Sequence, residues 1–337
     1  MRVHRRLLTA VAACAAAVLT THTLLPAQSR PDADLAREIF ETMSKLPGAD
    51  PARRPVHAKG VVCTGVFVPS KDAAGLSRAA HFAPDAIVSV TARLSDGAPS
   101  HGVADGSPDA GPRGLAVRFA TKDGQETDVV AMSHNGFVVG TGEEFLALQK
   151  AVVATDPSGP HPWPIERFLA GHPRAMKFVR DNRTVPASFA TESFFGNNAF
   201  VFVDRAGARR AGRYQFLPVA GSRHLTEAAA KAQAPNYLFD DLKSRLAAGP
   251  VQYRLVAQLA DPGDATNDSS LVWPADRKTV ELGVISLTAI VPDAAAAERR
   301  LAFDPANLTD GIELSDDPLP ALRSLVYALS AKHRRAE

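Results

Sequence analysis

Apolar residues recur along the first half of the chain with two different periods. Leu35, Ile39 and Met43 are spaced four residues apart within 32–45, which predicts an amphipathic helix. The segments that follow are rich in Val or alternate between apolar and polar residues, which predicts strands. These strands are expected at 56–68, 86–94, 115–121 and 127–132. The turn sequence Lys122-Asp123-Gly124 joins the last two and predicts a hairpin.

The second half of the chain mixes helical and strand patterns without a regular alternation. Helices are expected at 141–154, 237–248 and 319–335, and a pair of helices at 164–182 is broken at Gly171-His172-Pro173. Strands are expected at 199–204, 212–219, 251–259 and 280–291. Many strands with interspersed helices predict the α+β class. An antiparallel β-barrel with packed helices fits, although the pattern alone does not establish that the barrel closes.

Composition narrows the functional classes. The chain has 337 residues, 45% of them apolar, which is ample for a large core. A formal net charge of +2, with only short clusters of arginine, argues against a nucleic-acid-binding protein. The two cysteines are Cys14 and Cys63, too few for a disulfide framework or a multi-cysteine metal site.

The N-terminal segment has the pattern of an export signal. Arg2, Arg5 and Arg6 precede an apolar stretch at 7–19, and Leu25-Pro26-Ala27 offers a cleavage site. We therefore interpret 1–30 as a signal peptide, or as an uncleaved membrane anchor, and expect an exported, periplasmic protein. Residues 31–337 are expected to form one functional domain.

Two segments carry residues with chemical potential. Arg323, Tyr327 and Arg334 fall on one face of the last predicted helix. A guanidinium beside a phenol favours the phenolate, a hard anionic ligand suited to ferric iron. The alternative is an ordinary amphipathic helix with basic residues near its C-terminus. His57, at the start of a strand, could transfer protons near neutral pH, although a hydrogen-bonded core histidine has the same pattern.

Several motifs together resemble the monofunctional catalases. Arg54-x-x-His57-Ala58-Lys59-Gly60 is similar to their distal haem motif, and the segment 111–119 is similar to the strand that follows. The segment 303–317 resembles the approach to their proximal helix, and Arg323-x-x-x-Tyr327 with His333-Arg334 resembles that helix. The order agrees throughout, from about residue 38 to the C-terminus.

The resemblance implies a catalase-like core around haem b. It makes Tyr327 the axial ligand of the iron, Arg323 its guanidinium partner and His57 the distal acid–base group. Around the porphyrin it places Arg54, Arg113 and Arg334 at the propionates and Val117 over the distal face.

One departure bears on the expected activity. Catalases have an asparagine after the second hairpin strand, where this chain has Ser133, with Asn135 as the alternative if the loop is shifted. We therefore include Ser133 among the catalytic positions and expect a peroxidase that uses hydrogen peroxide or organic peroxides with small organic reductants. Catalase disproportionation is the first alternative, and a non-enzymatic haem or small-ligand-binding barrel is the second. The oligomeric state, a homo-oligomer included, is left open.

Overall fold

A closed antiparallel barrel forms the centre of the computed structural model, which describes residues 32–336. Within these residues, eight strands run in the order β10-β11-β1-β2-β3-β4-β6-β8, and the pairing of β10 with β8 closes the sheet. The barrel strands are β1 (Gly60–Pro69), β2 (Val88–Ser95), β3 (Gly114–Thr121), β4 (Glu126–Met132), β6 (Phe194–Phe195), β8 (Arg209–Pro218), β10 (Val251–Leu259) and β11 (Thr279–Ile290). This arrangement confirms the predicted α+β class and barrel.

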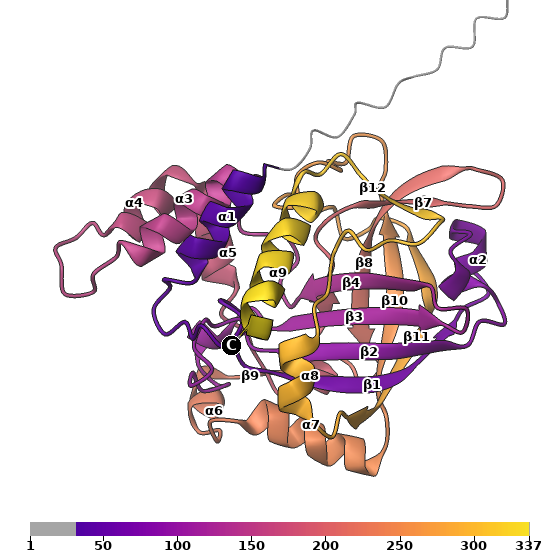
Figure 1. Ribbon diagram of the computed structural model, residues 1–337, viewed down its shortest axis with the longest axis horizontal. Coiled ribbons are helices and arrows are strands. Elements are labelled where there is room, and N and C mark those ends of the chain that lie inside the picture. Colours follow the sequence, from indigo (N-terminus) through magenta and orange to yellow (C-terminus); the bar gives the residue numbers. More distant parts are fainter. Residues whose placement is uncertain (1–31, 337) are drawn as a thin grey trace, which may run out of the picture. The chain divides into compact units, whose positions relative to one another are not determined.

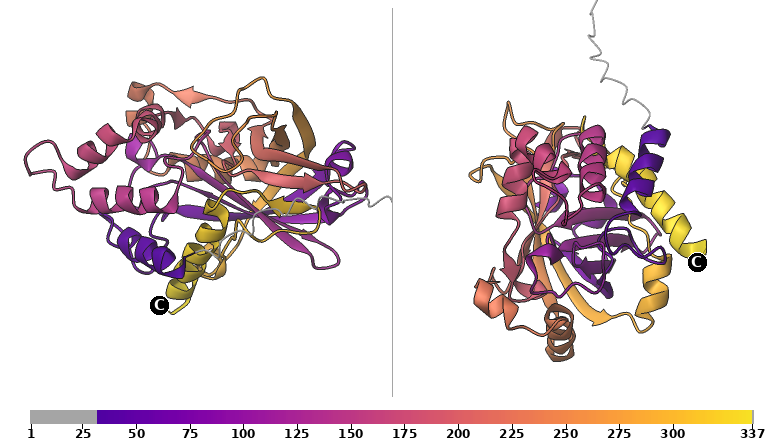
Figure 2. Two further views of the ribbon diagram at one scale, coloured as in Figure 1. Left: turned by 90° about the horizontal axis from the view of Figure 1, so that it is seen from above. Right: turned by 90° about the vertical axis from the view of Figure 1, so that its left-hand side faces the viewer.

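Shorter strands and the helices surround the barrel (Figure 1). The further strands are β5 (Val185–Pro186), β7 (Phe200–Val203), β9 (His224–Leu225) and β12 (Ile312–Leu314). The helices are α1 (Ala33–Met43), α2 (Ala73–Leu76), α3 (Gly142–Val153), α4 (Pro164–Gly171), α5 (Pro173–Asp181), α6 (Glu227–Lys231), α7 (Tyr237–Ala248), α8 (Ala294–Arg300) and α9 (Leu319–Ala336). Figures 1 and 2 show α1, α3, α4 and α5 gathered beside one end of the barrel, with α9 next to α1.

The barrel interior is filled by alternate residues of each strand. On β1, Cys63 and Phe67 are buried, whereas Val66 and Val68 are 47% and 62% exposed. The Phe67 ring meets the Phe119 ring of β3 edge-to-face, with centroids 5.1 Å apart. The period-two pattern of a strand therefore sets which side chains reach the core.

A second, smaller core joins three helices outside the barrel. It contains Ile39 of α1, Leu146 of α3, and Leu322 and Val326 of α9. The side chain of Asp32 caps α1 by accepting hydrogen bonds from the backbone N–H groups of residues 34 and 35. This packing holds α9 beside α1 and α3, and it matters because α9 carries the predicted iron ligand.

The sequence pattern predicts some elements better than others. The predicted helix 237–248 and strand 251–259 agree with α7 and β10 residue for residue. The strand predicted from residue 56 begins only at Gly60, because His57 has a left-handed φ of 55° that a strand does not allow. The predicted signal peptide lies outside the described residues, and within residues 32–336 no helix has the length and hydropathy of a membrane span.

The barrel core gives a direct stability prediction. Phe67→Ala should lower the free energy of unfolding by about 3–5 kcal/mol, because it leaves a cavity among packed aromatic rings. The exposed Val68→Ala on the same strand should change it by less than about 0.5 kcal/mol. Urea unfolding monitored by circular dichroism measures both, and equal losses for the two variants would contradict the assigned core.

Candidate active site

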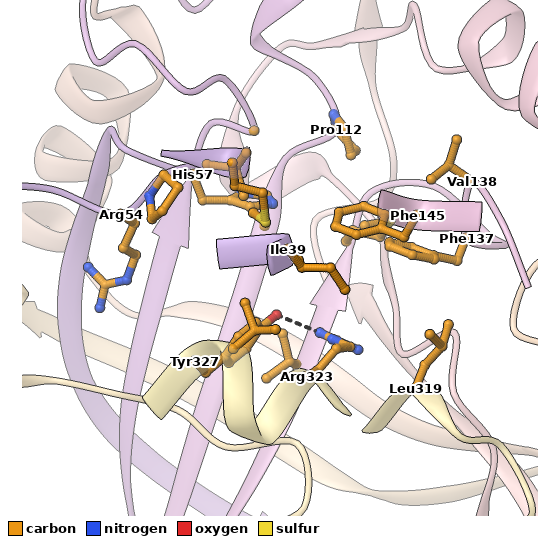
Figure 3. Close-up of a pocket in the computed structure, with 18 of the residues that line it drawn as sticks. Ile39, Arg54, His57, Pro112, Phe137, Val138, Phe145, Leu319, Arg323 and Tyr327 are labelled. Atoms are coloured by element: carbon orange, nitrogen blue, oxygen red, sulfur yellow. Dashed lines mark hydrogen bonds between the residues drawn. The ribbon is translucent and has the colours of Figure 1, made fainter. Parts of the chain in front are cut away.

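One large cavity lies between the barrel and the helices beside it. Its volume is about 520 Å³, within the range of roughly 300–1,000 Å³ that cofactor and small-molecule sites occupy. Strands β2, β3 and β4 form one wall, and α1, α3 and α9 form the rest of its central part. Figure 3 shows His57 on one side of this space and Tyr327 with Arg323 on the other. The two residues with the strongest chemical prediction therefore face a common cavity.

Helix α9 brings a tyrosine and an arginine together one turn apart. Arg323 donates from Nη2 to the Tyr327 hydroxyl at 2.8 Å, and its Nη1 donates to Asn198 Oδ1 at 2.5 Å. Asn198 in turn donates to a carboxylate oxygen of Asp317 at 2.8 Å. The chain of bonds fixes the guanidinium against the phenol oxygen. A phenolate aimed into a cavity is a fitting ligand for ferric iron.

His57 is held in a strained and specific conformation. Within residues 32–336, His57 is the only residue other than glycine with a positive φ. Its backbone N–H donates to Gly97 O at 3.1 Å, and its carbonyl accepts from Arg93 Nη2 at 2.8 Å. A Cβ on Gly114 would lie 2.9 Å from His57 Nδ1, so a side chain there would collide with the ring. Strain that is maintained by this many contacts is typical of functional positions.

The protonation of His57 follows from its surroundings. Burial, together with the positive charge of Arg93, lowers the pKa of His57 to about 3. The imidazole is therefore neutral at physiological pH. Its Nδ1 lies 3.1 Å from the hydroxyl oxygen of Ser95, which engages that nitrogen in a hydrogen bond. In the tautomer in which Nδ1–H donates to Ser95, Nε2 is the nitrogen that can accept a proton from a ligand.

Two arginines pair with one carboxylate at the edge of the cavity, and a third, Arg334, lines the cavity with them and donates to Ser330 Oγ and to the carbonyl of Leu301. Arg93 donates from Nε to both oxygens of Glu298, at 2.8 and 2.9 Å, and Arg54 also pairs with Glu298. Burial and the charge of Arg93 lower the pKa of Arg334 to about 10 and the pKa of Arg54 well below its usual value. The Nε of Arg334 is buried without a hydrogen-bond partner.

This cluster fits a ligand with two carboxylates. Three guanidinium charges and one carboxylate leave a formal excess of +2 in a buried setting, which is costly without further anions. The two propionates of haem carry the charge that would balance it, and the Nε of Arg334 offers a free donor. Together with a phenolate donor and a cavity of cofactor size, the residues present fit haem.

The structure places Arg113, which was predicted to bind the cofactor, outside the residues that line the cavity. Its Nε lies 3.0 Å from Asp96 Oδ1, and its Nη2 donates to the carbonyl of Asp105 at 2.5 Å. Gly114, the next residue, faces His57, and successive residues of a strand point to opposite sides. Arg93 on β2 does line the cavity, and it pairs with the same carboxylate as Arg54.

Two further predicted positions also lie off the cavity. Val117 is fully buried in the barrel core. Ser133 accepts a hydrogen bond from the backbone N–H of residue 113 and does not line the cavity, whereas its neighbour Met132 does. The apolar residues that do line it include Val56 and Val130. The lining includes consecutive residues of β3 and β4, so the alternation along a strand does not by itself separate cavity residues from the others.

The residues that the sequence prediction missed left signals of unequal strength. Arg93 lies in the predicted strand 86–94 and Ser95 follows it directly, and a charged residue within a strand can mark a buried polar group with partners. Met132 could have been found by counting strand alternation from His57's neighbour Gly114, its cross-strand partner. Glu298 lies far along the chain from the arginines it binds, so no local pattern pointed to it.

The fold and the cavity define a class of barrel proteins whose last helix presents a tyrosine to a buried site. The family model described as "Catalase" matches residues 37–337. The chain belongs to the catalase family.

Individual relatives cover most of the chain. It is 36% identical over 290 residues to "Catalase-related peroxidase" of Mycolicibacterium paratuberculosis, covering 85% of this chain and 90% of that protein. "Catalase-related peroxidase" of Synechococcus elongatus is 32% identical over 305 residues, 88% of each chain. A solved structure titled "Structure of a bacterial catalase" matches with a TM-score of 0.72 and 22% sequence identity. The match covers 84% of this chain and 57% of the solved chain. The solved structure supports the fold.

The lowered pKa of His57 predicts how the ring titrates. In the ligand-free protein, the Cε1–H resonance of His57, assigned with His57→Gln, should stay that of a neutral ring from pH 8 to about pH 4, with its pKa at about 3. The unfolded chain binds this proton near pH 6.5, so His57 should contribute a loss of stability as pH falls from about 6.5 to 3. A midpoint near 6.5 in the folded protein would contradict the assigned burial.

Proposed function

We propose that this protein is a haem b-dependent peroxidase that reduces hydrogen peroxide or organic peroxides at the expense of small organic reductants. The observation that carries the proposal is the placement of Tyr327, paired with Arg323, across one cavity from a neutral His57. The names of the two bacterial relatives, both catalase-related peroxidases, support the same activity.

The chain's own residues would bind and orient the cofactor. Bound haem would supply the iron at which the oxygen–oxygen bond of a peroxide is cleaved. The Tyr327 phenolate would be the iron ligand, and Arg323 would stabilise its negative charge. Arg54, Arg93 and Arg334 would pair with the propionates, and these charge-assisted bonds would fix the orientation of the ring.

His57 would move the proton that peroxide cleavage requires. Its neutral Nε2 accepts a proton from the nearer peroxide oxygen and returns it to the oxygen that leaves as water. Ser95, bonded to Nδ1, holds the ring in one orientation during both transfers. The low pKa of His57 means that the base form is already present at neutral pH.

The distal wall favours peroxidase chemistry over disproportionation. Met132 lines the cavity on β4, opposite Gly114, which lies against His57. A thioether donates no hydrogen bond and accepts only weakly, so it cannot orient a second molecule of peroxide as an amide does. Disproportionation remains the second candidate, because the chain belongs to the catalase family.

We also propose that the protein acts after export, in the periplasm. The basic residues and apolar stretch at the N-terminus support this location.

Removal of the phenol tests the iron ligand. Tyr327→Phe should lose most of its haem, or show a shifted Soret band, because the anionic donor is gone. Tyr237→Phe is the matched control, since the Tyr237 hydroxyl is buried and donates to Pro186 O away from the cavity. The measurement is the absorbance spectrum and haem content after reconstitution. A native spectrum for Tyr327→Phe would refute the ligand assignment.

Met132→Asn tests the balance between the two activities. An amide at this position can hold a second peroxide, so oxygen release should rise by about tenfold or more relative to dye oxidation. A Clark electrode and a guaiacol assay on the same haem-loaded sample give the ratio. If the wild type already releases oxygen rapidly and oxidises little dye, the peroxidase assignment fails. Met176→Asn, an exposed substitution, is the control.

A further inference from the structure

The cavity continues beyond the space between His57 and Tyr327 into an arm bounded by α3, α4 and α5. One face of α3 contributes Phe145, Leu148, Gln149 and Val152, which lie three or four residues apart as helix geometry requires. Figure 3 places Phe145, with Phe137 and Val138, on the side of the cavity away from Arg54. The arm is therefore separate from the arginine cluster and continuous with the candidate active site.

The remaining walls of the arm are apolar, and the arm reaches the surface at α5. Ile165 and Leu169 come from α4, and Phe178 and Val179 come from α5. Val179 lines the cavity and is also 45% exposed, which locates an opening beside it. Among the described residues, those that α3, α4 and α5 contribute to the lining carry no charge.

Gln149 is the one polar side chain that these three helices contribute to the lining. It is only 9% exposed and forms no hydrogen bond with another described residue. The two asparagines elsewhere in the wall differ, because Asn197 bonds to the 134–136 loop and Asn198 bonds to Arg323 and Asp317. The Gln149 amide is accessible from the cavity, so a ligand in the arm can both donate to it and accept from it. The arm therefore presents one donor–acceptor group within an apolar, partly aromatic lining.

We propose that this arm binds the electron donor of the proposed peroxidase, and that the donor is a neutral, apolar phenol. The phenol hydroxyl donates to the Gln149 carbonyl and accepts from its amide, while the ring packs among Phe145 and Phe178. Charged reductants are disfavoured, because the arm has no counter-charge to offset their desolvation. This inference rests on the proposed function.

The redox step balances with hydrogen peroxide as the oxidant. Each phenol loses one electron and its hydroxyl proton and becomes a phenoxyl radical. Two phenols reduce one peroxide: 2 ArOH + H₂O₂ → 2 ArO• + 2 H₂O. The O–O bond breaks, and the two protons from the phenols end in water. Gln149 binds and orients the phenol and takes no part in cleavage of the peroxide.

The test uses the full, haem-loaded chain and 4-propylphenol as the probe. Gln149→Leu keeps the volume of the side chain and removes its hydrogen bonds. The KM for 4-propylphenol should rise by about tenfold with a much smaller change in kcat, and the Kd from isothermal titration calorimetry should rise by a similar factor. In Gln149→Leu the KM for a sulfonated dye should stay unchanged, because such a dye does not enter the arm.

A control and a second variant keep the result decisive. Gln233→Leu, just after α6, is an exposed change outside the cavity and should leave both constants unchanged. Val152→Trp fills the arm and should weaken phenol binding without removing the haem Soret band. Unchanged KM and Kd for the phenol in Gln149→Leu, or an equal effect on the sulfonated dye, would overturn the proposal. Failure of the proposed function would appear earlier, as a wild-type protein whose spectrum does not change with hydrogen peroxide alone.

Discussion

The hydrogen bond from Arg323 to the Tyr327 hydroxyl is the contact on which the rest of the site depends. It places a positive charge against the one side chain that can supply an anionic ligand from α9. The bond is itself fixed by Asn198 and Asp317, which stand just before β7 and α9. The position of the phenol is therefore set by the barrel as well as by its own helix. Packing of α9 against α1 and α3 then brings the phenol to the side of the cavity opposite His57.

Charge balance explains the opposite edge of the cavity. Arginines from three separate parts of the chain would repel one another if they were buried alone. Glu298 reduces the repulsion, and the charges of Arg93 and Arg54 help to keep the pKa of Glu298 below its usual value despite the burial that raises it. The three arginines and Glu298 together keep a formal excess of two positive charges, which two carboxylates of a ligand would balance. In the apolar arm, Gln149 is singled out because it is the polar side chain that α3, α4 and α5 contribute to the lining.

Prediction from the sequence succeeded where the signal was local. Helical spacing placed Arg323, Tyr327 and Arg334 on one face, and the structure puts all three around the cavity. The short motif Arg54-x-x-His57 predicted two further site residues, and both line the cavity. The strong patterns at 237–248 and 251–259 gave their elements without error.

Three predicted site residues lie away from the cavity in the structure. Arg113 and Ser133 each lie next to a residue that does line the cavity, and Val117 is buried in the barrel core. The lining includes consecutive residues of β3 and β4, so the alternation along a strand does not by itself tell which residues reach the cavity. Glu298 and Gln149 acquire their significance only from side chains that are far away in the sequence. Tertiary geometry alone reveals such residues.

Stopped-flow absorbance of the haem-loaded protein mixed with hydrogen peroxide tests the central claim most directly. The wild type should show a rapid change of its Soret band. His57→Gln, with its haem still bound through Tyr327, should react more slowly by about 10²–10⁴-fold, because the distal base is missing. Equal rates for the two proteins would show that His57 does not face the iron, and the assignment of the two sides of the cavity would be wrong.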